Sequence, residues 1–188
     1  MGEDNFNSMR RIIISGGPGG GKSSLLEALR EAGFPCIQEV SRELIRGQVA
    51  ANSQCVPWKN LACFAKSCLD KMIADYHVAS DRSLTFFDRG IPDIIAYLRF
   101  GGIPVDDDFM VMAKKYRYDS NVVIAPPWAD IYVNDSERWQ TFSEAQALYL
   151  EIKNVYDELG YQMIELPLTP VEQRVAFTLT KLERIEYK

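Results

Sequence analysis

Residues 16–23 read Gly-Gly-Pro-Gly-Gly-Gly-Lys-Ser, and the fold class is inferred first of all from this motif. The pattern G-x-x-x-x-G-K-[ST] predicts a phosphate-binding loop, because its glycines let consecutive backbone N–H groups surround a phosphate without interference from a Cβ. Lys22 is expected to reach the β- and γ-phosphates, and the hydroxyl of Ser23 to bind Mg²⁺. The following helix would direct its positive N-terminus at the same anion. We therefore expect a nucleoside triphosphate to bind Gly17, Pro18, Gly19, Gly20, Gly21, Lys22, Ser23 and Ser24.

The sequence on either side of this loop has the required context. Residues 11–15 form a short β-branched run that predicts a buried strand. Residues 24–32 carry leucines at helical spacing, and Gly33 follows as a C-cap. A strand, a glycine-rich loop and a helix thus follow one another, as nucleotide binding by this motif requires.

The remaining chain alternates between strand and helix patterns. Further strands are expected at residues 34–39, 83–88, 121–125 and 161–166, and helices at 40–46, 58–80, 92–100, 109–116, 142–159 and 170–183. This alternation predicts an α/β fold with a mostly parallel sheet covered by helices on both faces. Residues 1–9 are expected to be a flexible tail, and residues 10–188 one domain with a lid at about 128–141.

Composition limits the class of protein. The chain has 188 residues, 47% of them hydrophobic and 25% charged, with a net charge of −5. The acidic balance argues against general binding to nucleic acid. Residues 1–8 lack the apolar core of a secretory signal, and no apolar run approaches membrane-spanning length. A cytoplasmic protein with reduced thiols is expected.

The cysteine and histidine pattern gives no indication of zinc. The four cysteines contain no C-x-x-C pair, and His77 is the only histidine. Cys63 and Cys68 fall in an apolar helical stretch, where buried free thiols are expected. A zinc site is therefore not predicted.

Charged residues follow three of the expected strands, at the sheet edge where ligands bind in this class of fold. Asp88 ends a buried run and resembles the carboxylate that helps to hold Mg²⁺ beside a phosphate loop, although it could instead cap the next helix. Glu39 could take the proton of an attacking hydroxyl, bind a sugar hydroxyl or be a surface carboxylate. Arg42 lies one helical turn further on and could face the same cleft. Which of Glu39 and Asp88 is the general base stays open.

The segment at 134–140 lies between the fourth strand and its helix, where a flexible segment can close over a nucleotide. Arg138 could then stabilise charge on the transferring phosphoryl group, or remain a solvated loop arginine.

Several motifs together resemble the NadR/Ttd-type AAA domain-containing predicted ATPases, which include the ribosylnicotinamide kinase domain of NadR. The resemblance runs in order over nearly the whole chain and rests on residues 16–24, 39–42, 87–93, 134–139, 160–167 and 171–174. It implies a three-layer, kinase-type P-loop fold with strand order 2-3-1-4-5 and a lid carrying Arg138. It also implies a loop near residues 168–174 that packs against adenine, so that Arg174 belongs to the nucleotide site. Arg89 and Asp135 are expected to contact the substrate.

These features predict a small-molecule kinase that uses ATP and Mg²⁺ on a nucleoside- or nucleotide-like acceptor. The alternative is a nucleotide-dependent switch with slow hydrolysis and a protein or lipid partner. An ordinary GTPase is disfavoured, because residues 88–91 are not D-x-x-G and no N-K-x-D follows the fourth strand. A homodimer is compatible with a fold of this kind.

Overall fold

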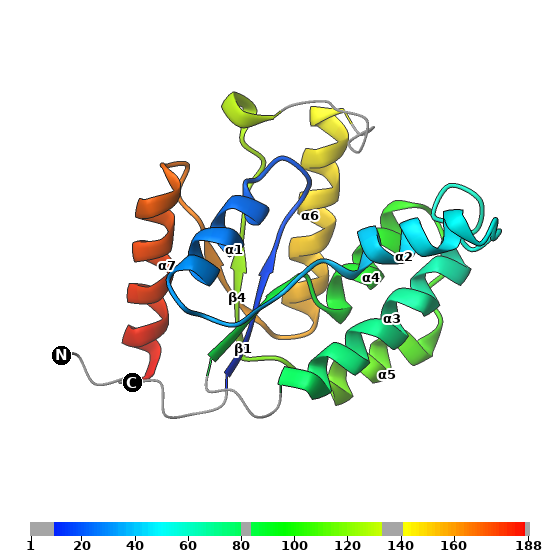
Figure 1. The fold of residues 1–188 in the computed structure, drawn as a ribbon, viewed down its shortest axis with the longest axis horizontal. Coiled ribbons are helices and arrows are strands. Elements are labelled where there is room, and N and C mark those ends of the chain that lie inside the picture. The colour runs from blue at the N-terminus through cyan, green and yellow to red at the C-terminus, as the bar shows by residue number, and fades with distance from the viewer. Residues whose placement is uncertain (1–9, 80–83, 133–140, 187–188) are drawn as a thin grey trace.

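The computed structural model describes residues 10–79, 84–132 and 141–186, and within them a parallel sheet lies between layers of helices (Figure 1). The sheet has five strands in the order β2-β3-β1-β4-β5, which confirms the predicted fold class and strand order. The strands are β1 (Arg10–Ser15), β2 (Cys36–Ile37), β3 (Leu84–Asp88), β4 (Asn121–Ile124) and β5 (Gln162–Glu165).

The helices lie close to their predicted positions. They are α1 (Lys22–Glu31), α2 (Val40–Ala50), α3 (Leu61–Val78), α4 (Ile91–Phe100), α5 (Asp107–Lys115), α6 (Phe142–Glu158), α7 (Val171–Glu186) and the short 3-10 helix η2 (Ala129–Ile131). The predicted start of α3 at residue 58 is wrong, because the side chain of Asn60 accepts a hydrogen bond from the backbone N–H of Cys63 and caps the helix there. None of the described helices combines the length and apolarity needed to span a membrane.

The second strand is much shorter than the predicted 34–39. It pairs with β3 at only two residues, at the edge of the sheet. Its chain leaves the sheet early because Glu39 already occupies the N-cap position of α2. The short strand thereby brings the Glu39 carboxylate to the carboxyl edge of the sheet.

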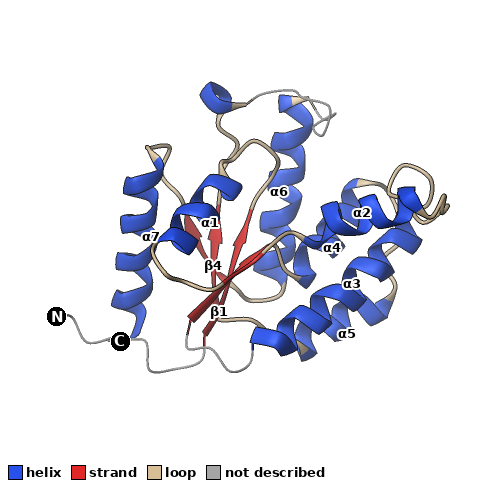
Figure 2. Ribbon diagram, viewed as in Figure 1, coloured by secondary structure: helices blue, strands red, loops and turns tan. Residues whose placement is uncertain are grey.

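The central strand β1 separates two hydrophobic cores because its side chains alternate between the faces of the sheet. Ile12 and Ile14 pack with leucines of α1 and with Leu182 of α7. Ile13 points to the other face and belongs to the core that contains α3, α4, α5 and α6. Figure 2 shows the strands between these two groups of helices.

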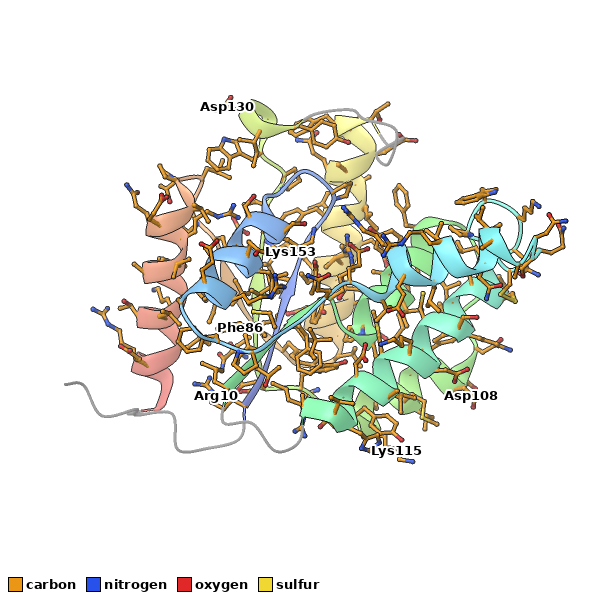
Figure 3. All side chains as sticks on the ribbon, in the orientation of Figure 1. Arg10, Phe86, Asp108, Lys115, Asp130 and Lys153 are labelled. Carbon is orange, nitrogen blue, oxygen red and sulfur yellow. A yellow bond between two sulfur atoms is a disulfide. The ribbon has the colours of Figure 1, made fainter. Side chains whose placement is uncertain are left out.

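One group of helices extends beyond the sheet and forms a wall next to β2 and β3. Helix α4 packs against α3, α5 and α6, and α2 packs on α3 (Figure 1). Arg10 at the start of β1 and Asp130 in η2 lie at opposite ends of the sheet (Figure 3). The strands therefore end on the side of η2, and the loops that could bind a ligand gather there.

The prediction of reduced thiols is wrong for two cysteines. Cys55, in the loop after α2, forms a disulfide with Cys63 in the first turn of α3, with the two Cα atoms 5.3 Å apart. The loop folds back onto the helix, and the spacing of the cysteines in the sequence does not predict this conformation. Cys36 and Cys68 are free, as expected.

Candidate active site

The loop between β1 and α1 has the conformation that the glycine-rich motif predicts. Gly16 and Gly21 both have positive φ, at 129° and 73°. A Cβ on Gly16 would collide with the carbonyl oxygen of Ala125, and one on Gly21 with the guanidinium of Arg174. The glycines are thus required by backbone conformation and by the close approach of neighbouring groups.

Lys22 begins α1 and folds back over the loop. Its Nζ donates to the carbonyl oxygens of Gly16 at 2.9 Å and Gly17 at 2.7 Å. Burial, followed by the nearby charge of Arg89, lowers the pKa of Lys22 to about 8. Lys22 is 7% exposed, so its charge is poorly solvated and would interact strongly with an incoming phosphate.

Asp88, at the end of β3, carries an unpaired buried oxygen. Its Oδ1 has no hydrogen-bond partner among the described residues. Burial raises the pKa of Asp88 to about 6, against the attraction of Lys22. Asp88 and Ser23, the two predicted Mg²⁺ ligands, line one cleft. The described residues hold no cluster of three acidic, cysteine or histidine side chains for a metal.

Glu39, which is partly buried, and the buried Arg89 form an ion pair at this edge of the sheet. The Nε of Arg89 donates to Oε1 of Glu39 at 3.2 Å, and the hydroxyl of Ser41 donates to the same oxygen at 2.6 Å. Burial alone would raise the pKa of Glu39, but Arg89 and Ser41 outweigh it and lower the pKa to about 2. Glu39 is therefore ionised throughout the physiological range.

A buried carboxylate that the sequence analysis missed lies behind this pair. Asp93, in the first turn of α4, is 1% exposed. It accepts hydrogen bonds from the hydroxyl of Ser15, the N–H of Gly90, the hydroxyl of Tyr156 and Nη1 of Arg89. Two signals were available: an acid inside the apolar run 91–95, and its place in the segment 87–93 that carries the family resemblance.

Arg174, in the first turn of α7, lies on the opposite side of the phosphate-binding loop. Its Nη2 donates to the carbonyl oxygen of Gly20 at 2.8 Å, and its guanidinium lies 5.9 Å from the Trp128 ring centre. The side chain is 2% exposed, and its Nε has no hydrogen-bond partner among the described residues. Burial lowers the pKa of Arg174.

A cleft of about 550 Å³ opens beside the phosphate-binding loop, between α1, α2 and α3. Ser23 and Asp88 line it together with Glu39 and Arg42, so the structure brings these four predicted residues to one space. Cations and carboxylates of α1, α2 and α3 complete its walls, namely Glu27, Arg30, Glu43, Arg46, Lys71 and Asp75.

Of the predicted lid at about 128–141, the structure describes residues 128–132 and Thr141. Residues 128–132 lead from β4 into η2, and the Tyr132 ring lies directly against Gly19 of the phosphate-binding loop. Asp135 and Arg138 lie outside the described residues.

Comparisons with known proteins agree with this architecture. The family model of an AAA domain matches residues 11–174. Curated protein sequences give no match. Deoxyadenosine kinase from M. mycoides, solved with dCMP and dCDP, has a TM-score of 0.66 at 14% identity, with 93% of this chain and 99% of that chain covered.

Two further solved structures have similar folds. NadR, in complex with NR, has a TM-score of 0.63 at 16% identity, with 93% of this chain and 51% of that chain covered. Thymidylate kinase from Ehrlichia chaffeensis has a TM-score of 0.60 at 15% identity, with 94% and 99% covered. At these identities the likeness establishes the fold, which is that of P-loop kinases. Since the family model covers most of the sequence, this chain belongs to the AAA domain family that it describes.

Proposed function

We propose that this protein is a phosphotransferase that moves the γ-phosphoryl group of ATP to a nucleoside- or nucleotide-like acceptor. The cleft beside the phosphate-binding loop carries this proposal. It is large enough for a small molecule, and its walls include both Ser23 of the loop and Glu39 of the acceptor side. A hydrolytic switch needs room only for water at this position, whereas a kinase needs a second substrate there.

On the donor side, the loop N–H groups and Lys22 would hold the β- and γ-phosphates. The pKa of Lys22 is lowered because the residue is buried away from water. In such a site the attraction between the Lys22 ammonium and phosphate oxygens is stronger than in water. Arg138 on the lid would add positive charge to the transferring group. Arg174 would support the loop from behind through the carbonyl oxygen of Gly20.

The residues present fit a magnesium ion. Asp88 offers a buried oxygen that no described residue pairs with, and Ser23 lies on the same cleft. Mg²⁺ is usually held by one or two protein groups together with substrate phosphates and water, so two protein ligands suffice. When bound, the ion would neutralise charge on the phosphates during transfer.

On the acceptor side, Glu39 would accept a hydrogen bond from the attacking hydroxyl and orient it toward the γ-phosphate. Arg89 keeps Glu39 ionised, so the carboxylate can only accept a hydrogen bond. Its low basicity is adequate because phosphoryl transfer depends mainly on positioning and on charge stabilisation. Arg42, on the cleft wall, would contact the remaining part of the acceptor, as would Arg89 and Asp135.

The test is a panel of nucleosides, nucleotides and sugar-like metabolites incubated with ATP and Mg²⁺. We expect one class of acceptor to yield a phosphorylated product by mass spectrometry and to raise the rate of ADP release. If every acceptor leaves ADP release at a slow basal rate, the protein is a nucleotide-dependent switch.

The variant Lys22→Ala is a second test of the proposed phosphotransferase activity. We expect turnover to fall about 10³-fold, since a charged donor to the transferring group is lost. The melting temperature of the ligand-free protein should change little, because Lys22 is a buried cation whose charge is poorly solvated. Lys66→Ala, at an exposed lysine of α3, is the control and should retain full turnover. Turnover retained in Lys22→Ala would show that another site hydrolyses ATP.

A further inference from the structure

We propose that Asp93 is a positioning residue for phosphoryl transfer, which fixes Arg89 between the acceptor carboxylate Glu39 and the first carbonyl of the phosphate-binding loop. The proposal rests on the phosphotransferase function proposed above. It concerns a residue that touches neither the nucleotide loop nor the cleft, and that acts through its neighbour.

The contacts of Asp93 join four separate segments of the chain. Its Oδ2 accepts from the N–H of Gly90 at 2.8 Å and from the hydroxyl of Tyr156, on α6, at 2.6 Å. Its Oδ1 accepts from the hydroxyl of Ser15, the last residue of β1, and from Nη1 of Arg89 at 3.5 Å. The ends of β1 and β3 are therefore tied to α4 and α6 by one carboxylate.

The Arg89 side chain makes three further contacts besides that with Asp93. Its Nη1 donates to the carbonyl oxygen of Gly16 at 3.0 Å, and its Nε donates to Glu39. The ring of Tyr97 lies 5.2 Å from its guanidinium carbon. One side chain thus connects the start of the phosphate-binding loop to the acceptor side of the cleft.

The backbone of Arg89 is strained in a way that needs such support. Its φ is 73°, in the left-handed region that residues with a Cβ rarely adopt. Strain of this kind persists where the surroundings over-determine it, and it gathers at functional sites. Asp93 supplies part of that constraint, because it binds both the Arg89 guanidinium and the N–H of the next residue, Gly90.

Helix capping alone does not account for Asp93. A capping box explains the hydrogen bond from Gly90 N–H, and a capping acid can remain at the surface. Asp93 is instead almost completely buried, and an ionised carboxylate in such a place is costly unless it is paired. The bonds from Ser15, Arg89 and Tyr156 lie outside the capping pattern. Those from Ser15 and Arg89 hold groups beside the phosphate-binding loop, whereas the bond from Tyr156 ties α4 to α6.

The experiment compares Asp93→Asn with Tyr156→Phe. Each variant alters a hydrogen bond of Asp93, but only Asp93→Asn weakens the interaction of residue 93 with the Arg89 guanidinium. We expect Asp93→Asn to lower kcat about 100-fold, since small displacements of a positioned group have effects of this size. Its KM for ATP and its Kd for ADP should stay within about threefold of the wild type, because the donor loop is intact. Tyr156→Phe should keep kcat within about threefold.

A double variant tests whether Asp93 acts through Arg89. If it does, Arg89→Lys/Asp93→Asn should be about as slow as the slower single variant, because the two losses share one cause. Multiplied losses in the double variant, or equal losses of kcat in Asp93→Asn and Tyr156→Phe, would overturn the proposal and leave Asp93 a purely structural residue.

Two further measurements keep the test decisive. Should Asp93→Asn fail to fold, Asp93→Glu takes its place; it keeps the charge but displaces it, and should lower kcat about tenfold. Wild-type kcat in folded Asp93→Glu would overturn the proposal. Should no acceptor stimulate the wild-type protein, the proposed function fails, and basal ATP hydrolysis becomes the rate compared between these variants.

Discussion

Two buried arginines contact the phosphate-binding loop from opposite sides, and their surroundings differ in charge. Arg89 donates to the carbonyl oxygen of Gly16 and is 8% exposed, whereas Arg174 donates to that of Gly20 and is 2% exposed. Arg89 pairs with two carboxylates, Glu39 and Asp93. Among the described residues, no carboxylate forms an ion pair with Arg174.

The two arginines also differ in the direction in which the pKa of each guanidinium is shifted. Burial opposes the charge of Arg89, but Tyr97 and the neighbouring carboxylates outweigh it and raise its pKa well above the ordinary value. At Arg174, burial acts without such compensation and lowers the pKa. Arg89 is thus part of the internal charge balance of the protein, while Arg174 has a charge that a bound phosphate group could balance. Three variants test this difference between the two arginines and the charges around them.

The largest effect is expected for Arg89→Gln. Removing this cation leaves the partly buried carboxylate of Glu39 and the buried carboxylate of Asp93 without their ion-pair partner, and breaking a buried ion pair costs about 3 kcal/mol or more. The midpoint of urea unfolding should fall accordingly. Arg99→Gln, which breaks a more exposed pair with Glu158, should cost about 1 kcal/mol or less. Similar midpoints for the two variants would mean that Arg89 is not a structural cation.

An intermediate effect, of opposite sign, is expected for Asp88→Asn. Folding raises the pKa of Asp88 from 3.8 to about 6, so its ionised form costs the folded state free energy at neutral pH. The variant should therefore be more stable at pH 7 by about 2 kcal/mol, while its turnover is lost. The gain should shrink as the pH falls from 6 to 4, where the wild-type carboxyl becomes protonated in both states.

Thermal unfolding between pH 4 and pH 7 measures this pattern, and Asp108→Asn is the control. Asp108 is an exposed aspartate of α5, so its replacement should leave stability nearly constant over the same range. A stability gain in Asp88→Asn that does not depend on pH would contradict the assignment to a buried, ionised carboxylate.

The smallest effect is expected for Arg174→Gln, and it concerns binding. The free energy of unfolding of the ligand-free protein should change by about 1 kcal/mol or less, because no described carboxylate loses an ion-pair partner. Affinity for ADP, measured by calorimetry, should fall about tenfold, which is the size expected when a charge near a phosphate is removed. Arg174→Lys should recover part of the affinity. Lys181→Gln, on the exposed face of α7, should bind ADP normally, and equal affinity in Arg174→Gln would show that Arg174 only packs the loop.

Much of the fold could be predicted from short segments of sequence. The phosphate-binding loop, its flanking strand and helix, and the position of Asp88 at a strand end depend on neighbouring residues and on a periodic pattern. Glu39 and Arg42 could be placed on one cleft because parallel strands end at the same edge of the sheet. The length of β2 could not be predicted, since it depends on where Glu39 begins the next helix.

The remaining features of the site depend on contacts between distant segments. Tyr156 reaches Asp93 across 63 residues, and Arg174 reaches Gly20 across 154. The Cys55–Cys63 disulfide is close in sequence, but it requires a loop that turns back on its own helix. No local sequence pattern predicts these contacts, because they are set by how the helices and loops pack in the folded protein.

The phosphate-binding loop and the fold around it thus follow from the sequence, because backbone conformation and hydrophobic periodicity depend on consecutive residues. The electrostatics of the site, in contrast, depend on the tertiary structure. It gave Arg89 two carboxylate partners and placed Arg174 against the loop, and among the described residues it left one oxygen of Asp88 buried without a partner. Burial and pairing are properties of the surroundings, and apart from Asp93, four residues after Arg89, the partners named here come from segments far away along the chain.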